Sequence, residues 1–115
     1  MRQLCLVAAA PQDEALLAEY AHIHEPANIP ASTIRALRRS GIHDCRIYKA
    51  EDRLIMIIEA EDGFSMQRAA ALNAGDEEVQ SWNRRIASLL QGSAAAGPLW
   101  VEAARLFDLA DHPGE

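Results

Sequence analysis

Tyr20 and His24 are the two residues of this sequence best suited to proton chemistry. They lie four residues apart in a segment, residues 13–24, whose apolar spacing predicts a helix. Residues at that spacing share one helical face, and Pro26 in the following stretch 25–29 should end the helix beside the histidine. A phenol and an imidazole placed in this way can exchange protons with one small polar ligand.

The same helical pattern distinguishes the two histidines of this segment. At 100° per residue, Leu16, Tyr20 and Ile23 fall within one narrow arc, and His24 lies on the edge of that arc. His22 falls outside it and should point to solvent. We therefore expect His24 to be the histidine that reaches a pocket.

A second predicted helix, residues 76–90 with Asp76 as its cap, places Trp82 and Asn83 on one face. An indole offers a flat apolar platform, and an amide can bind hydroxyl groups. Together with Tyr20 and His24, these side chains suit a neutral polyol with one apolar face, which is a description of a sugar. One acid and one base could interconvert sugar anomers without a cofactor, because one proton goes to the ring oxygen while another leaves the anomeric hydroxyl.

Other chemistries find less support among the residues. The sequence has no nucleophile paired with an activating base, no metal-ligand spacing and no glycine-rich phosphate loop. Each candidate also has a structural interpretation: Tyr20 and Trp82 fit a packed core, His24 a structural histidine, and Asn83 a cap on a buried backbone group. The residues alone leave both interpretations open.

The composition is that of one globular domain with an acidic surface. The chain has 115 residues, half of them hydrophobic, and 11 basic against 17 acidic side chains give a net charge of −6. A negative charge of this size argues against nucleic acid or an anionic membrane as the partner and favours a neutral or cationic small ligand. We expect one domain over residues 1–110 and a polar tail over 111–115.

The cysteines and the apolar runs point to the cytoplasm. Cys5 and Cys45 lie in predicted strands without metal-type spacing and are interpreted as free, buried thiols in a reducing compartment. No signal peptide is recognisable, and the longest apolar run, residues 54–58, is far shorter than the roughly 20 residues that cross a bilayer.

The order of predicted elements indicates a ferredoxin-like α+β fold, an antiparallel four-stranded sheet with helices on one face. In the helix over 30–40, which Gly41 should end, Ile34 and Leu37 are expected to face inward. A tight turn should lie at residues 51–52 and a small-residue loop at 92–97. The expected strands are residues 4–9, 43–49, 53–60 and 100–109, and the expected helices are residues 13–24, 30–40, 64–72 and 76–90.

One face of such a sheet is left without helices. The strand at 53–60 is so uniformly apolar that both its faces should be covered. We therefore expect the open face either to wrap around a ligand pocket or to be buried against a second copy, and we predict a homodimer.

Several short segments resemble the L-rhamnose/L-fucose mutarotase family, small cytoplasmic sugar epimerases that act at the anomeric carbon. They occur in the family's order and spacing over nearly the whole chain, and His24-Glu25-Pro26-Ala27-Asn28-Ile29 is more similar to the L-fucose branch than to the L-rhamnose branch. The matching segments are Ala15-Leu16-Leu17-Ala18-Glu19-Tyr20, His24 to Ile29, Ser40-Gly41-Ile42, Ile47-Tyr48, Arg53-Leu54-Ile55-Met56 through Glu59, Val79-Gln80-Ser81-Trp82, Trp100-Val101 and Leu106-Phe107.

The resemblance implies a ferredoxin-like α+β fold that dimerises into an α+β barrel. It also implies an enzyme that acts on L-fucose, L-rhamnose or another free 6-deoxyhexose. It implies that His24 is the main acid/base residue, that Tyr20 contacts the sugar or helps to protonate it, and that Trp82 lines the sugar site. The role of Asn83 rests on the helical-face argument. Cys45 and Asn28 occupy further positions expected to contact the substrate, and no metal or other cofactor is expected.

The chain departs from the family pattern in three places. Pro30-Ala31-Ser32 stands where a Trp-Pro-Glu word is usual, Cys45 where the rhamnose branch has a tyrosine, and Ala104 where a glutamate is usual in the last strand. These departures alter the pocket around the proton-handling pair more than the fold.

We therefore predict an aldose 1-epimerase with His24 and Tyr20 handling protons and Trp82 stacking on the sugar. The first alternative is a non-catalytic sugar-binding or regulatory protein that kept the pocket and lost turnover. The second is a different enzyme on the same dimeric sandwich, such as a small oxygenase acting on an aromatic or haem ligand, because fold alone does not fix function.

Overall fold

A computed structural model describes residues 1–91 and 99–114 of the chain. The loop predicted at residues 92–97 lies outside this described part. The elements follow the predicted order: β1 (Arg2–Ala9), α1 (Glu14–Ile23), α2 (Ala31–Arg39), β2 (Ile42–Ala50), β3 (Arg53–Ala60), α3 (Met66–Asn73), α4 (Glu77–Gln91), β4 (Val101–Glu102) and a short 3-10 helix (Leu109–Asp111).

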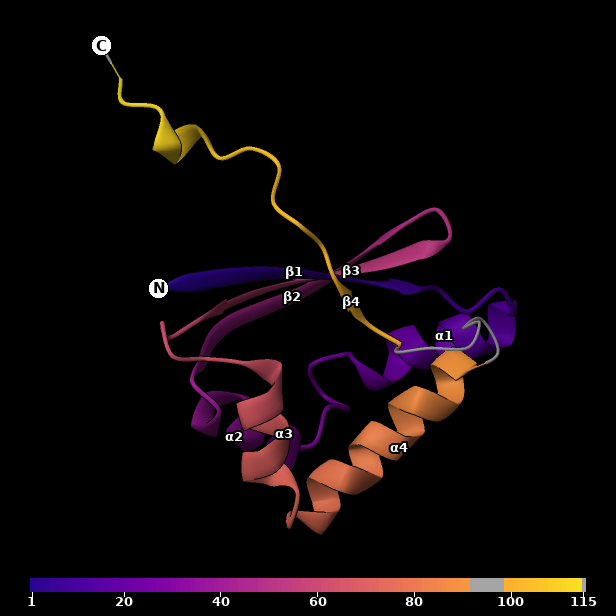
Figure 1. Cartoon of the computed structure of the whole chain (residues 1–115). Helices are drawn as coiled ribbons and strands as arrows, with labels where there is room; N and C mark the ends of the chain where they lie inside the picture. The colour runs from indigo at the N-terminus through magenta and orange to yellow at the C-terminus, as the bar shows by residue number, and fades with distance from the viewer. Residues whose placement is uncertain (92–98, 115) are drawn as a thin grey trace.

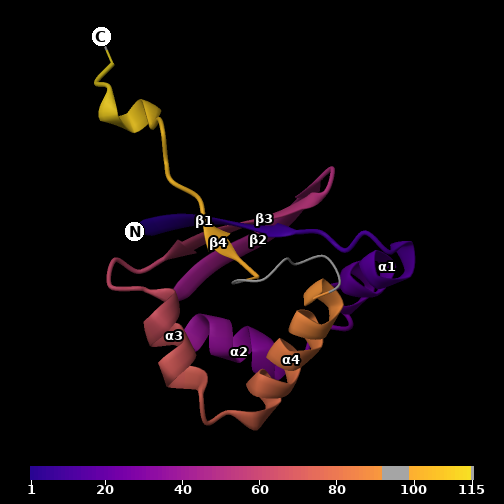
Figure 2. The same ribbon diagram turned by 45° about the vertical axis from the view of Figure 1, so that its right-hand side comes forward.

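The four strands form one antiparallel sheet in the order β2-β3-β1-β4. All four α-helices lie on the same side of this sheet, and its other side carries no helix (Figure 1 and Figure 2). The predicted ferredoxin-like α+β fold is confirmed. None of the helices in the described residues is long and apolar enough to span a membrane.

Strand pairing determines which side chains face the helices. In β1, Leu4, Leu6 and Ala8 are buried against them, and the residues between face the open side. In β2 the register shifts between Ile42, which pairs with Ala60, and Asp44, which pairs with Glu59. His43 is the extra residue of this β-bulge. After the bulge, Cys45 pairs with Ile58 and therefore shares the helix-facing side with that buried residue.

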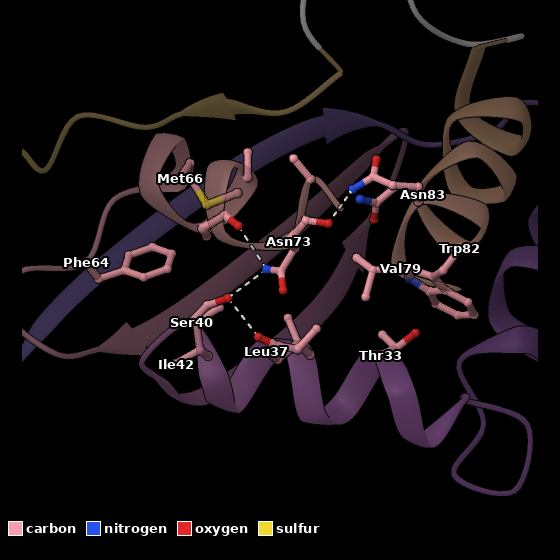
Figure 3. Close-up of a pocket in the computed structure, with 15 residues that line it drawn as sticks. Thr33, Leu37, Ser40, Ile42, Phe64, Met66, Asn73, Val79, Trp82 and Asn83 are labelled. Atoms are coloured by element: carbon pink, nitrogen blue, oxygen red, sulfur yellow. Dashed lines mark hydrogen bonds between the residues drawn. The ribbon is translucent and has the colours of Figure 1, made fainter. Parts of the chain in front are cut away.

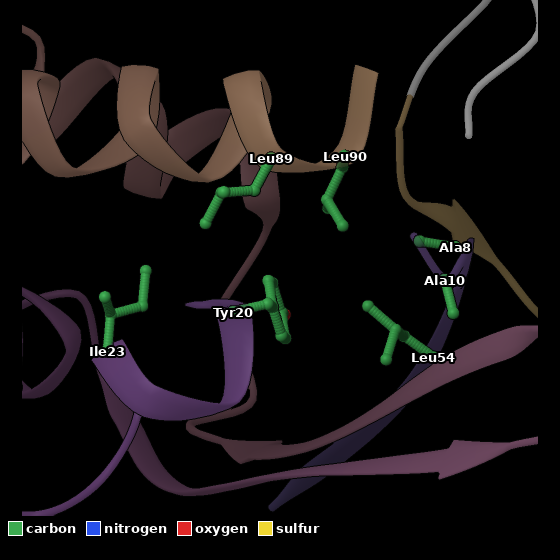
Figure 4. Packing of buried hydrophobic residues seen from close by; sticks show 7 residues of the cluster. All are labelled: Ala8, Ala10, Tyr20, Ile23, Leu54, Leu89 and Leu90. Carbon is green, nitrogen blue, oxygen red and sulfur yellow. The ribbon is translucent and has the colours of Figure 1, made fainter. Parts of the chain in front are cut away.

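The buried apolar residues form two clusters between the sheet and the helices. Trp100 packs against both clusters and so joins them. The first cluster, shown in Figure 4, consists of Ala8, Ala10, Tyr20, Ile23, Leu54, Leu89 and Leu90. The second consists of Leu4, Leu6, Ile42, Ile58, Ala60 and Phe64.

The first helix agrees with the sequence prediction at both ends. Its cap is Asp13, whose carboxylate accepts hydrogen bonds from the amides of Ala15 at 2.8 Å and Leu16 at 3.2 Å. His24 is the C-terminal cap, with helical backbone angles. The histidine of interest therefore sits at the last turn, where the chain leaves the helix.

The second helix buries a more polar face than predicted. Ile34 and Leu37 are only half-buried, whereas Ser32, Thr33 and Ala36 are the buried residues of α2. Small side chains can occupy the face closest to neighbouring elements, which displaces the longer apolar ones toward the edge. Gly41 ends this helix as predicted, with φ of +90°, a conformation that glycine adopts without strain.

The predicted last strand over residues 100–109 is wrong in length. Only Val101 and Glu102 pair with β1, followed by one hydrogen bond from the Ala103 amide to the Cys5 carbonyl. After Ala103, local contacts favour a turn. The Asp108 carboxylate accepts a hydrogen bond from the Ala110 amide and forms an ion pair with Arg105 at 2.9 Å. Ala104 lies outside the sheet and is exposed.

The C-terminal segment runs away from the body of the domain, as both ribbon views show. Leu106 is 97% exposed, Phe107 67% and Leu109 71%. The two cysteines are free, and both are half-buried where burial was expected. The division into residues 1–110 and 111–115 stays a prediction.

Candidate active site

Tyr20 and His24 lie against each other at the end of α1. Their ring centroids are 4.4 Å apart and their planes are tilted by 34°. Tyr20 is buried in the first core cluster, where Figure 4 shows it among Leu54, Leu89 and Leu90, while His24 is half-buried. The predicted pair is thus brought together, with the phenol on the inner side.

A hydrogen bond to the backbone fixes the protonation of the His24 ring. Its Nδ1 lies 2.6 Å from the carbonyl oxygen of Tyr20. A carbonyl oxygen only accepts, so Nδ1 must carry the hydrogen and donate it. In the neutral ring the other nitrogen, Nε2, then holds the lone pair and is the atom that can take up a proton and release it.

The Tyr20 phenol is protonated at neutral pH. Burial, together with the nearby Cys45 thiol, raises the pKa of Tyr20 to about 12 from its ordinary value of 10.0. Burial and the adjacent Asp44 likewise raise the pKa of Cys45. At neutral pH the phenol and the thiol are therefore both uncharged, and the side chain of the pair able to act as a base is His24.

Trp82 reaches the pair from α4. Its indole meets the His24 imidazole edge to face, with centroids 5.3 Å apart and planes at 68°. On the protein surface Arg85 of α4 forms an ion pair with Glu19 of α1 at 2.5 Å. These two contacts hold the indole of Trp82 beside the imidazole of His24.

Trp82 and Asn83 also line a cavity of about 360 Å³ between α2, α3 and α4. Asn83 is exposed, and Figure 3 shows both residues at the α4 side of this cavity. Tyr20, His24 and Cys45 do not line it. Trp82 is thus the residue that contacts His24 and also borders the cavity.

Asn28 and His22 lie on the surface beside the site. The Asn28 amide donates to the carbonyl oxygen of His22 at 2.9 Å and to the Glu25 carboxylate at 3.3 Å, and the Asn28 side chain is exposed. His22 is exposed as predicted and lies 3.7 Å from the Glu25 carboxylate. The structure therefore brings together Tyr20, His24, Trp82 and Cys45, and it places Asn28 in the supporting loop.

Metal ligands do not gather anywhere in the described residues, where no group of three His, Cys, Asp or Glu side chains could hold an ion. The sequence analysis overlooked Thr33, which is buried and lines the cavity. The spacing Thr33, Ala36, Leu37 and Ser40 marks one helical face that could have been recognised, but its polar and small residues carry a weak hydrophobic signal.

Comparison with known proteins identifies the family. A family model described as L-rhamnose mutarotase matches residues 4–109. The chain belongs to the L-rhamnose mutarotase family. It is 33% identical over 114 residues to an L-fucose mutarotase of Xanthomonas campestris pv. campestris, an alignment that covers 96% of this chain and 90% of that protein.

A solved structure supports the fold of this mutarotase family member. The crystal structure of an L-rhamnose mutarotase from Formosa agariphila superposes with a TM-score of 0.66, covering 94% of this chain and 98% of that one, at 14% identity. Membership of the mutarotase family makes the chain an isomerase that acts on sugar anomers.

Proposed function

We propose that the chain interconverts the α and β anomers of a free 6-deoxyhexose such as L-fucose or L-rhamnose. The observation that carries this proposal is the hydrogen bond from His24 Nδ1 to the Tyr20 carbonyl, because it leaves Nε2 free to exchange a proton on a ring that lies beside Tyr20 and Trp82. Interconversion needs one proton removed and one supplied, and no other group has to be transferred.

The proposed reaction balances with these side chains. His24 Nε2 takes the proton of the anomeric hydroxyl while Tyr20, directly or through a water molecule, gives its phenolic proton to the ring oxygen. The bond between C1 and the ring oxygen breaks to give the open aldehyde and the C5 hydroxyl. Rotation about C1–C2 turns the other face of the carbonyl toward the C5 hydroxyl. Reclosure returns each proton, and each positioned acid or base contributes roughly 10²–10⁴-fold.

Tyr20 and Trp82 have different roles in this scheme. With its pKa raised to about 12, Tyr20 is protonated before the reaction and donates its proton along a hydrogen bond to the ring oxygen, directly or through a water molecule. It regains a proton from the C5 hydroxyl when the ring closes. Trp82 supplies the surface on which the apolar face of the sugar stacks. In the same proposal Cys45 forms part of the floor beneath Tyr20, Asn83 binds a hydroxyl and Asn28 holds the loop after His24.

The proposal includes a homodimer in the cytoplasm. The open face of the sheet carries the apolar side chains of Val7, Ile55 and Ile57, and Val101 pairs with Val7 on that side. The exposed Leu106 and Phe107 add apolar area outside the fold. A second copy would cover both, and two free thiols fit a reducing compartment.

Saturation-transfer NMR of anomer exchange tests the function. The wild-type chain should accelerate exchange of L-fucose or L-rhamnose, and His24→Ala should abolish the acceleration. His22→Ala is the matched control, because that histidine is exposed and lies two residues away. Acceleration that survives His24→Ala would refute the mechanism, and calorimetric sugar binding without any acceleration would identify a non-catalytic sugar-binding protein instead.

A further inference from the structure

Helices α1 and α4 run antiparallel and meet along one seam. Trp82 of α4 contacts His24 at the end of α1. Arg85, three residues further along α4, donates a hydrogen bond to the carboxylate of Glu19, five residues earlier in α1. Trp82 is thus about one helical turn from Arg85, and Tyr20 directly follows Glu19. The ion pair therefore lies beside the side chains that are proposed to act on the sugar.

The buried part of this seam is apolar. Figure 4 shows Tyr20 and Ile23 of α1 below Leu89 and Leu90 of α4, and all four belong to the first core cluster. Apolar contacts are non-directional, so they hold the helices together without strongly selecting one position of α1 along α4. A hydrogen-bonded ion pair depends steeply on distance and angle, and charged pairs of this kind determine register between packed elements.

Two neighbouring arginines of α4 differ in where their partners lie. Arg85 pairs with Glu19 across the seam at 2.5 Å, and both side chains are about half exposed, at 54% and 43%. Arg84 pairs with Glu77 of its own helix at 2.8 Å, and both of these side chains are more exposed. The pair within α4 cannot position that helix relative to α1, so Arg84 provides a natural control for Arg85.

We propose that Glu19 and Arg85 are positioning residues of anomer exchange, whose ion pair sets the place of the His24 imidazole relative to the Trp82 indole. This inference rests on the proposed function for the reaction that the pair affects. The sugar stacks on Trp82, and Nε2 of His24 has to reach its anomeric hydroxyl. A misplacement of about 1 Å can slow a reaction roughly 10²-fold, so even a small shift of α4 along α1 should be visible in kcat.

Removal of the positive charge tests the positioning role. Arg85→Met keeps a long side chain and loses the ion pair, so it should lower kcat by roughly 3- to 10-fold through a sub-ångström displacement of His24. KM should stay within about twofold of the wild type, because the indole that binds the sugar is still present. Arg84→Met, the matched control, should leave both constants unchanged. The two variants should have similar melting temperatures, because each loses one exposed ion pair.

Reversal of the two charges separates positioning from a direct effect of charge on His24. Glu19→Arg and Arg85→Glu each place two like charges together and should lower kcat at least as much as Arg85→Met. The double variant restores an ion pair with the opposite orientation and should recover most of the wild-type kcat. A wild-type kcat in Arg85→Met, or a double variant as slow as the single ones, would overturn the proposal.

Proton NMR gives a readout that does not depend on turnover. An indole shifts the resonances of protons near its ring, so the ring protons of His24 report the position of Trp82. At about pH 9, above the ordinary titration range of histidine, Arg85→Met should move the His24 resonances and Arg84→Met should not.

The inference and the proposed function can fail separately. His24 resonances that stay in place in Arg85→Met, in a chain whose wild type accelerates exchange, would remove the inference alone. Resonances that move, in a chain whose wild type does not accelerate exchange, would keep the role of the ion pair in the His24–Trp82 contact and remove the catalytic function.

Discussion

The imidazole of His24 and the indole of Trp82 meet edge to face across two helices that are more than fifty residues apart in the sequence. His24 closes α1, and Trp82 lies in the second turn of α4. The contact makes the position of the His24 ring depend on the packing of α4. A change in that helix should therefore alter catalysis as well as sugar binding.

Two substitutions of Trp82 should separate the stacking of an aromatic ring on the sugar from the support that the side chain gives to His24. Trp82→Phe keeps an aromatic face and should raise KM several-fold, whereas Trp82→Ala should raise KM by about tenfold or more and lower kcat, because His24 loses its neighbour. Anomer-exchange kinetics at several sugar concentrations measure both constants. Unchanged kcat in Trp82→Ala would show that the contact does not position His24.

Tyr20→Phe should change how the free energy of unfolding depends on pH, because it removes the buried phenol. The folded-state pKa of about 12 lies above the ordinary value of 10.0, so the wild-type contribution is complete below pH 10 and is lost as pH rises toward 12. Tyr20→Phe should lack this loss. Urea unfolding from pH 8 to 11.5 measures the free energy of unfolding of the two proteins. Both contain Cys45, so the difference between them reports the phenol.

The same substitution should lower activity at neutral pH. The loss of the phenolic donor should reduce kcat by roughly 10²- to 10⁴-fold, the range for a positioned general acid. Because the phenol titrates far above neutrality, the defect should be constant between pH 7 and pH 9. A defect that disappears at the higher pH would indicate that Tyr20 acts in another way.

The homodimer can be tested on the open face of the sheet. Ile57→Glu places a charge on that face and should convert the dimer to a monomer of about 12.6 kDa in analytical ultracentrifugation. Leu72→Glu is the control, because Leu72 is an exposed apolar residue on α3, away from the open face. A wild-type protein that sediments as a monomer at micromolar concentration would refute the homodimer.

Asn73 should be the most sensitive polar position of the helix layer. Asn73→Ala removes hydrogen bonds to Ser40 and the Ala69 carbonyl and leaves Arg39 with one partner fewer, which should cost about 2–3 kcal/mol. Gln67→Ala, an exposed position on the same helix, should change stability by less than about 0.5 kcal/mol. Chemical denaturation measures both free energies of unfolding.

Local patterns in the sequence were sufficient for most of the fold. The boundaries of α1 and β3 follow from periodicity and from the Asp13 cap, and the helical arc correctly separates half-buried His24 from exposed His22. These features depend on residues close together in the chain. The two-residue β4 was not predictable in the same way, because the end of an edge strand depends on pairing with β1.

The parts of the site that were missed depend on contacts between distant elements. The His24 hydrogen bond arises because the ring folds back onto the last turn of α1, a detail of the cap geometry. The cavity at Thr33 exists only where α2, α3 and α4 meet. Helical spacing can place Thr33 on a face of α2, but it cannot tell whether a neighbouring helix fills the space beside it.

The β-bulge at His43 determines which side chains of β2 face the helices. Side chains alternate along a strand, so a β2 that kept every residue but continued from Ile42 without the bulge would point Asp44 and Arg46 at the helices and turn Cys45 to the open face. Charged groups would then lie on the helix side of β2, where the uncharged Cys45 thiol now lies near Tyr20. Loss of the bulge alone would thus reverse the polarity of the surface beside Tyr20 and His24, with the sequence unchanged.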